Sequence, residues 1–157
     1  MEFKCASIQD SAIDGYGFSK VVYFQGCKFN CPNCHNKELQ DFNRGGIATT
    51  QYVIEQFNSH KSFYDSIVFL GGEPLEQEDA VLEICSELDT IKWLYTGYEY
   101  EEISLQIIQS CDIIVTGRYR EDLKTGSFPA SSNQKIIFRG DVVEDPINFR
   151  SWLRQAI

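Results

Sequence analysis

The amino-acid sequence predicts an α/β protein whose mostly parallel sheet forms a partial, open barrel. Runs of β-branched and aromatic residues alternate along the chain with amphipathic helical stripes, which is the pattern of repeated strand–helix units. Four or five such units fit into the 157 residues, and we expect them to form one domain, 1–157. An eight-unit barrel needs a longer chain, so the barrel is expected to stay open.

Five buried strands are expected. The first covers 21–24 and ends directly at Gly26 and Cys27. The others cover 66–70, 91–95, 112–115 and 135–138. The second, third and fourth strands each end in a turn that carries glycine, at Gly71, Gly97 and Gly117. Because the carboxyl ends of parallel strands meet at one edge of a sheet, we expect these turns to face a shared cleft.

Helices are expected between these strands and after the last one. A helix capped by Thr49 or Thr50 has an apolar side at 53, 54 and 57. The next helix has Pro74 in its first turn and buries a stripe at 81, 84, 85 and 88, which places Cys85 in the core. An acidic helix start is expected at 99–102. A last helix begins at Asp145-Pro146 and buries Phe149, Trp152, Leu153 and Ala156.

Two polar stretches are expected to be irregular. Residues 14–18, just before the first strand, are rich in glycine and suit a hairpin turn. Residues 36–46 are polar and resemble a loop.

Three cysteines, Cys27, Cys31 and Cys34, lie within eight positions and predict a metal site. A structural zinc site needs four ligands, and His35 would have to bind the same metal as its neighbour, which is strained. The remaining three cysteines are scattered singly, and Cys111 is expected to be structural. A four-iron cluster is normally held by thiolates, so three of them would leave one iron open to a substrate. A zinc or electron-carrying site with a remote fourth ligand, or cysteines that bind nothing, remain alternatives.

The turn after the second strand reads Gly71-Gly72-Glu73-Pro74. Two glycines at a strand end let a ligand approach the backbone closely, and Glu73 offers a carboxylate. Such a turn is often structural, and its position after a three-cysteine loop is what makes it a candidate binding element.

Composition and charge narrow the class of protein. The chain is 43% hydrophobic and 24% charged, with no apolar run near the length of a membrane span. Its net charge of −9 argues against a nucleic-acid partner. The first residues lack an apolar signal core, so we expect a cytoplasmic protein with reduced thiols. Neither of the two histidines has the neighbours of a hydrolytic triad.

The spacing of Cys27, Cys31 and Cys34 resembles the signature of the radical S-adenosylmethionine enzymes. Further segments follow in the order and at about the spacing of the anaerobic ribonucleoside-triphosphate reductase activating proteins, the glycyl-radical-enzyme activase branch: 34–36, 41–46, 71–75, 94–98, 112–119 and 131–134. The resemblance implies a barrel of the radical S-adenosylmethionine type, with a [4Fe-4S] cluster on the three cysteines and S-adenosylmethionine on its open iron. It also implies that the cofactor is lined by Asn33, Cys34, His35, Gly71, Gly72, Glu73 and Thr96.

The activity implied by this resemblance is that of an oxidoreductase. An electron from a flavodoxin-like donor would pass through the cluster and split S-adenosylmethionine, giving a 5′-deoxyadenosyl radical. That radical would take a hydrogen atom from a glycine of the large reductase subunit and leave a glycyl radical there. Residues 95–98 are candidates for the cleft wall, and residues 131–134 for contacts with the reductase.

Two other functions remain possible at this point. One is another single-cluster radical S-adenosylmethionine enzyme that acts on a small molecule, of the 7-carboxy-7-deazaguanine synthase type. The other is a non-enzymatic iron–sulfur or zinc module for electron transfer or scaffolding, which would bind no S-adenosylmethionine.

Overall fold

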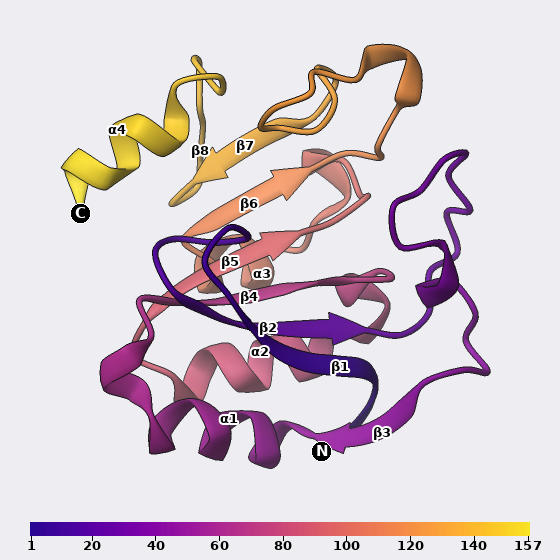
Figure 1. Ribbon diagram of the computed structural model, residues 1–157, viewed down its shortest axis with the longest axis vertical. Helices are drawn as coiled ribbons and strands as arrows, with labels where there is room; N and C mark the ends of the chain where they lie inside the picture. Colours follow the sequence, from indigo (N-terminus) through magenta and orange to yellow (C-terminus); the bar gives the residue numbers. More distant parts are fainter.

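The computed structural model describes residues 1–157 and contains one sheet of eight strands. The strands are β1 (Glu2–Ser11), β2 (Ser19–Phe24), β3 (Gly46–Thr49), β4 (Ser66–Gly71), β5 (Ile91–Tyr95), β6 (Ile113–Thr116), β7 (Lys135–Phe138) and β8 (Asp141–Val142). Their order in the sheet is β3-β1-β2-β4-β5-β6-β7-β8 (Figure 1). Each outermost strand pairs on one side only, so the sheet does not close.

The four central strands, β2, β4, β5 and β6, run parallel to one another. The expected α/β fold, a partial and open barrel with a mostly parallel central sheet, is therefore confirmed. The flanks differ from the expectation, because β1, β3, β7 and β8 all pair antiparallel with their neighbours. Strand β7 reverses direction because the chain between β6 and β7 contains only the short 3₁₀ helix η5 (Glu121–Leu123), whereas a parallel return needs a crossover, usually an α-helix.

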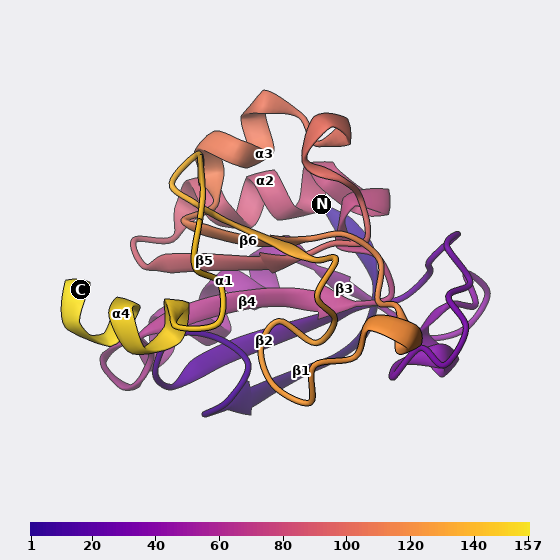
Figure 2. The same cartoon turned by 90° about the horizontal axis from the view of Figure 1, so that it is seen from above.

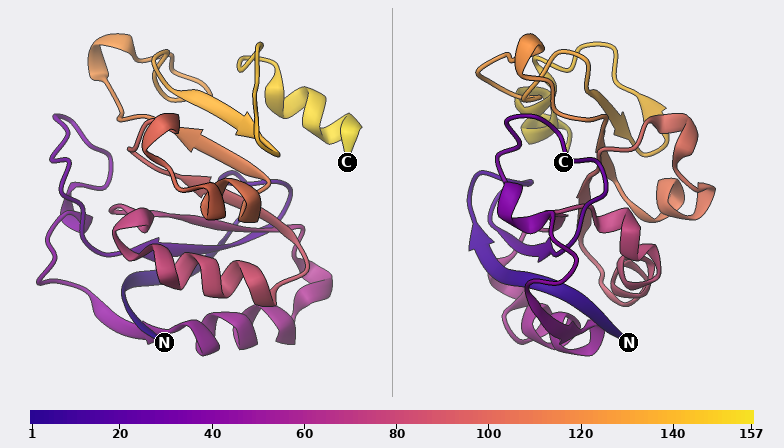
Figure 3. Two further views of the ribbon diagram at one scale, coloured as in Figure 1. Left: turned by 180° about the vertical axis from the view of Figure 1, so that it is seen from behind. Right: turned by 90° about the vertical axis from the view of Figure 1, so that its right-hand side faces the viewer.

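Three helices cover one face of the sheet and a fourth covers the other (Figures 2 and 3). The first three are α1 (Thr50–Ser59), α2 (Glu78–Glu87) and α3 (Leu105–Ser110), and the fourth is α4 (Phe149–Ala156). The short 3₁₀ helices are η1 (Lys37–Leu39), η2 (Lys61–Phe63), η3 (Pro74–Gln77) and η4 (Tyr100–Glu102). None of the helices is both long and apolar enough to cross a bilayer.

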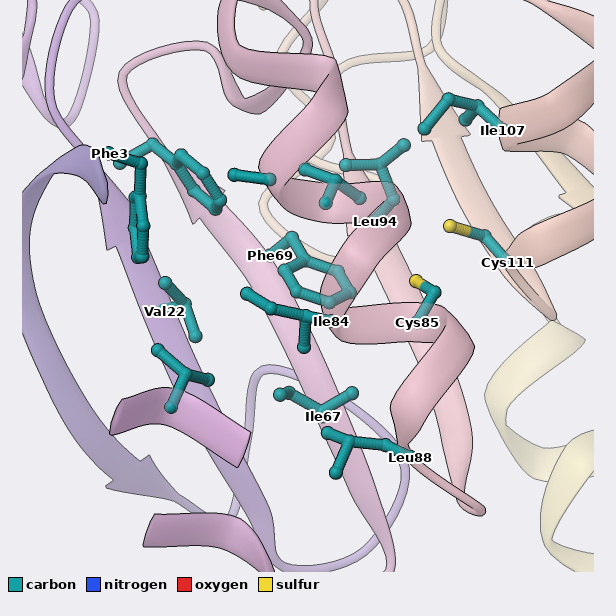
Figure 4. Packing of buried hydrophobic residues seen from close by; sticks show 14 of the residues in the cluster. Phe3, Val22, Ile67, Phe69, Ile84, Cys85, Leu88, Leu94, Ile107 and Cys111 are labelled. Carbon is teal, nitrogen blue, oxygen red and sulfur yellow. The ribbon is translucent and has the colours of Figure 1, made fainter. Parts of the chain in front are cut away.

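Two hydrophobic cores follow from this arrangement. The larger core has 19 buried residues and includes Phe69 and Leu94 of the sheet together with Ile84 of α2 (Figure 4). Cys85 and Cys111 belong to it, as expected, and their side chains lie close to each other in Figure 4. The smaller core of eight residues lies on the opposite face, where Phe149 and Leu153 of α4 pack with residues that include Trp93.

Several helix ends differ from the sequence expectation. Glu99 caps only the short η4, in which the Glu99 and Glu102 side chains form a capping box, and α3 begins later with Ser104 as its cap. Helix α4 begins at Phe149 and not at Asp145-Pro146. The expected burial is wrong for two of the four residues named in this helix. Trp152 and Ala156 are exposed, because the eight-residue helix turns only one narrow side to the sheet.

Three strands were not expected from the sequence: β1, β3 and β8. All three lie on the flanks of the sheet, and two of them are only four and two residues long. Residues 14–18 lie in the connection between β1 and β2, which pair as an antiparallel hairpin, so the hairpin interpretation of this stretch is confirmed.

Candidate metal centre and cofactor cleft

A cavity of about 350 Å³ lies at the carboxyl ends of the parallel strands. It is lined by the segment after β2, by the turns after β4, β5 and β6, and by the loop before β7. The expected convergence of the strand ends on one cleft is therefore present. Asp14, from the connection between β1 and β2, also lines this cavity.

The three clustered cysteines sit in a loop that leaves the sheet after β2 and projects beyond the strand ends (Figure 1). Two backbone hydrogen bonds close the base of this loop: Gly26 N to Leu39 O at 2.7 Å and Cys27 N to Gln40 O at 3.1 Å. Between them the chain curls through positive φ angles at Asn30 and Asn33. The three thiols are free, half-buried and line the same cavity.

The electrostatic environment of these thiols disfavours an isolated thiolate. Burial first, and then the Glu73 carboxylate and the neighbouring thiols, raise the pKa of Cys27 to about 11. Burial and Cys34 likewise raise the pKa of Cys31, against the opposing effect of the Arg118 guanidinium. Three sulfur ligands that repel one another as anions are stabilised by a cationic group between them.

No fourth sulfur joins this donor set, because Cys5, Cys85 and Cys111 are buried in the larger core. The exposed His35 ring lines the same cavity, where it lies 4.8 Å from the ring of Tyr119. No group of three or more His, Cys, Asp or Glu side chains is arranged to hold a single metal ion. Three thiols spread around one cavity fit a four-iron cluster with one open iron better than they fit zinc, which needs four close ligands.

Gly71, the last residue of β4, and Gly72 line the cavity, and both also lie close to the backbone of neighbouring segments. A Cβ atom on Gly72 would lie 2.5 Å from Gly26 O and 2.6 Å from Leu39 O, both of which belong to the base of the cysteine loop. Gly71 adopts φ +116°, and a Cβ there would meet the backbone of Phe24 at 2.5 Å. The absence of side chains at Gly72 and Gly71 therefore lets the base of the cysteine loop and the end of β2 pack closely against this turn.

Glu73 is almost fully buried, at 1% exposed, and its carboxylate is held by three donors. Gly97 N donates to Oε1 at 2.7 Å, while Leu75 N and Thr96 Oγ1 donate to Oε2 at 2.8 and 2.9 Å. Burial raises the pKa of Glu73 to about 7, although these hydrogen bonds act in the opposite direction. The carboxylate therefore ties the turn after β4 to the turn after β5.

The turn after β5 is held from a second side. Tyr95 Oη donates to Asp14 O at 2.6 Å and accepts from Arg150 at 3.3 Å. Arg150, from α4, also donates to the carbonyl oxygens of Gly15 and Asp14 and lies 4.4 Å from the centre of the Phe128 ring. One side chain of the C-terminal helix thus joins the hairpin connection, β5 and the loop before β7.

Two groups of predicted residues take other positions. Asn33 is exposed and is not among the residues that line the cavity. Ser131 is fully buried, and Asn133 and Gln134 donate to the carbonyl oxygens of Arg118 and Gly117, so these side chains hold the turn after β6.

Phe29, Arg118, Tyr119 and Phe128 line the cavity and were not named as site residues from the sequence. Arg118 and Tyr119 directly follow a strand-end glycine, which is a signal that could have found them. Phe29 lies inside the cysteine loop, where the sequence signal is the spacing of the cysteines and not the residues between them. Phe128 lies between strands and carries no local signal.

A second cavity, of about 390 Å³, lies between β7, β8 and α4. It is lined by apolar side chains together with Asp141, Asp145 and Asn148. It contains none of the thiols, and we assign no ligand to it.

Comparison with known proteins adds independent evidence. Residues 13–137 match the model of the 4Fe-4S single cluster domain family. The anaerobic ribonucleoside-triphosphate reductase-activating protein of Enterobacteria phage T4 is 29% identical over 136 residues, covering 79% of this chain and 86% of that protein. Its counterpart from Escherichia coli K12 is 27% identical over 140 residues, covering 79% and 90%.

Two further similarities are more distant. The pyruvate formate-lyase-activating enzyme of Clostridium pasteurianum is 28% identical over 116 residues, covering 66% of this chain and 46% of that enzyme. The crystal structure of QueE from Escherichia coli superposes with a TM-score of 0.55 at 12% identity, covering 76% of this chain and 73% of QueE, and shows likeness of fold alone. The chain belongs to the 4Fe-4S single cluster domain family, and its expected place in the glycyl-radical-enzyme activase branch of the radical S-adenosylmethionine enzymes is confirmed.

Proposed function

We propose that this protein activates an anaerobic ribonucleoside-triphosphate reductase by installing a glycyl radical on its large subunit. The observation that carries the proposal is a cavity at the strand ends that is lined by three thiols, from Cys27, Cys31 and Cys34, and by no fourth thiol. Relatives of similar length that are 27% to 29% identical are named for this activation. The whole chain, 1–157, would act as one radical S-adenosylmethionine domain.

The cofactors are a [4Fe-4S] cluster and S-adenosylmethionine. Cys27, Cys31 and Cys34 would hold the cluster, and the residues near S-adenosylmethionine would be Cys34, His35, Gly71, Gly72, Glu73 and Thr96, which all line the cavity, whereas Asn33 does not. When bound, the two groups together supply a carbon-centred radical that is able to remove a hydrogen atom from a glycine Cα.

The chain's own residues position these groups and shield the cavity. The buried Glu73 carboxylate fixes the turns after β4 and β5 relative to each other, so that both present backbone groups to the same space. Tyr95 and Phe128 form apolar parts of the wall, and Arg150 holds both of them from behind. Such a wall excludes water from a reactive centre.

The partner that receives the radical would be the large reductase subunit, whose glycine loop would have to enter the open side of the cavity. We further propose a flavodoxin-like electron donor and a cytoplasmic setting. The setting is supported by six cysteines that are all free thiols.

The test is an electron paramagnetic resonance experiment on the anaerobically reconstituted and reduced protein, with and without S-adenosylmethionine. We expect a reduced [4Fe-4S] signal that changes shape when the cofactor is added, and a glycyl-radical signal when the large reductase subunit is present. Replacement of Cys27, Cys31 or Cys34 by Ala should abolish both signals, whereas Cys85→Ala, in the core, serves as the matched control.

Other outcomes would favour another function. A cluster that ignores S-adenosylmethionine would indicate an electron carrier, and no cluster would indicate zinc. A cofactor response without any glycyl radical on the reductase would indicate an enzyme that acts on a small molecule.

A further inference from the structure

Phe29 occupies the centre of the three-residue spacer between Cys27 and Cys31, and its half-buried ring is held on two sides. The Tyr98 ring contacts it in an edge-to-face arrangement, with the ring centres 4.8 Å apart and the planes at 70°. The guanidinium of Arg118 lies 4.3 Å from the centre of the Phe29 ring. The ring therefore joins the cysteine loop to the turns after β5 and after β6.

A third contact depends on the absence of a side chain. A Cβ atom on Gly97 would lie 2.7 and 2.8 Å from two ring carbons of Phe29, closer than such atoms approach in proteins. The φ angle of Gly97 lies outside the left-handed region, so its backbone does not by itself require glycine. The glycine is needed for the space that the Phe29 ring fills.

The residue before Phe29 adds a weaker contact from the same loop. Lys28 Nζ lies 5.1 Å from the centre of the Tyr98 ring and 3.8 Å from Glu76 Oε1, which accepts a hydrogen bond from Tyr98 Oη at 2.6 Å. Because Lys28 is exposed, this contact contributes little energy. The Phe29 ring remains the main attachment of the loop's middle.

Arg118 is the second component of this arrangement. It lines the cavity, and its guanidinium forms no ion pair with any carboxylate of the chain. A long cationic side chain without a partner would sample many positions, and its contact with the Phe29 ring restricts it. Its charge is thereby held at the wall of the cavity that the three cysteines also line.

We propose that Phe29 is a positioning residue for the metal centre, an inference that rests on the proposed function. Its ring seats the cysteine loop in the space kept by Gly97 and holds the Arg118 charge beside the cysteines. A positive charge near a cluster stabilises the reduced form, which carries one more negative charge. Two measurable quantities therefore depend on Phe29: how completely the loop retains iron, and how easily the cluster is reduced.

The experiment compares iron content and midpoint potential in the anaerobically reconstituted full-length protein, without S-adenosylmethionine. Phe29→Leu keeps an apolar side chain but removes the ring, and we expect its iron content per chain to fall at least twofold. Gly97→Ala should give the same loss, because the methyl group displaces the ring. Phe29→Tyr should restore the wild-type iron content, and Phe63→Ala, an exposed aromatic residue outside the loop, is the control.

The midpoint potential separates positioning from simple stability. Arg118→Gln should retain the iron and lower the ratio of reduced to oxidised cluster at a given potential by about threefold, since the exposed charge acts through a dielectric near that of water. At 59 mV per tenfold change for one electron, this is a shift of about 28 mV to more negative potential. The cluster retained by Phe29→Leu should shift in the same direction, and Phe29→Tyr should not shift.

The inference is overturned if Phe29→Leu and Gly97→Ala retain iron at the wild-type level, or if the potential of Arg118→Gln equals that of the wild type. Circular dichroism of each variant establishes that the fold is intact, and Arg118→Gln, an exposed substitution, decides the electrostatic part even if a loop variant loses its structure. The proposed function fails in a different way, namely if the wild-type protein itself assembles no [4Fe-4S] cluster.

Discussion

The buried carboxylate of Glu73 gives a prediction whose size follows from its surroundings. In the Glu73→Gln variant the side-chain amide has one acceptor oxygen, whereas three donors now point at two carboxyl oxygens, both of which can still accept in the protonated side chain that prevails at pH 5. Whichever way the amide turns, its NH₂ group faces the backbone N–H of Gly97 or of Leu75. A buried donor without a partner costs about 1–3 kcal/mol, so we expect the variant to be less stable than the wild type at pH 5.

The pH dependence of this difference has a definite sign. Burial raises the pKa of Glu73 in the folded protein to about 7, above the ordinary value of 4.5. Between these values the folded state binds the proton more tightly than the unfolded state, so the contribution of Glu73 to stability is largest below pH 4.5 and is lost as the pH rises through 7. From pH 5 to pH 8 the loss is about 2–3 kcal/mol. The glutamine variant has no such loss, and its deficit relative to the wild type should shrink or reverse by pH 8.

The assay is urea unfolding of the cluster-free, reduced protein, with the wild type and Glu73→Gln compared at pH 5, 6, 7 and 8. The variant Glu55→Gln, at an exposed position on α1, controls for general effects of pH on the fold. A difference between wild type and Glu73→Gln that stays constant across this range, or that grows with pH, would refute the reasoning.

Three further substitutions test two contacts of the cleft and the placement of one thiol in the core. Gly72→Ala places a methyl group 2.5 Å from a backbone oxygen at the base of the cysteine loop and should cost about 1–3 kcal/mol in urea unfolding, whereas Gly46→Ala, whose nearest neighbour is 3.8 Å away, should change stability by about 0.5 kcal/mol at most. Arg150→Met removes the hydrogen bonds to the hairpin connection and β5 and should lower the thermal midpoint by several degrees, and Arg154→Met, exposed on the same helix, should not. Cys85→Ala should leave the iron content of the reconstituted protein unchanged, and a loss of iron there would contradict the assignment of this thiol to the core.

Much of the candidate site could be predicted because its elements are local in sequence. The three cysteines lie within eight positions, and no folding is needed to bring their loop together. The strand-end glycines were informative for a related reason, since each directly follows a buried apolar run and the carboxyl ends of parallel strands meet at one edge. The central strands were predictable because burial on both faces makes them continuously apolar.

The flanking strands were harder to predict. Strand β1 alternates between exposed and buried residues only over positions 2–5, and beyond the bulge between Cys5 and Ser7 its residues are half-buried or exposed, so no period of two runs through the strand. Strands β3 and β8 are too short to show any period. The direction of β7 depends on whether the connection before it is able to cross back over the sheet. The residues of the strand itself carry no information on this point.

The sequence by itself determined the metal-binding loop, the α/β class and the shared edge at which the strand ends meet, because each of these depends on a pattern of residues that are close together in the chain. Only the tertiary structure showed which parts of the chain Glu73, Gly72 and Gly97 contact: the Glu73 carboxylate accepts a hydrogen bond from the turn after β5, and the absence of side chains at Gly72 and Gly97 leaves space for the cysteine loop. The contact of Arg118 with Phe29 joins residues that lie far apart in the chain. The physical reason is that burial, hydrogen bonding and close packing act between surfaces, and which surfaces meet is fixed only when the sheet has formed.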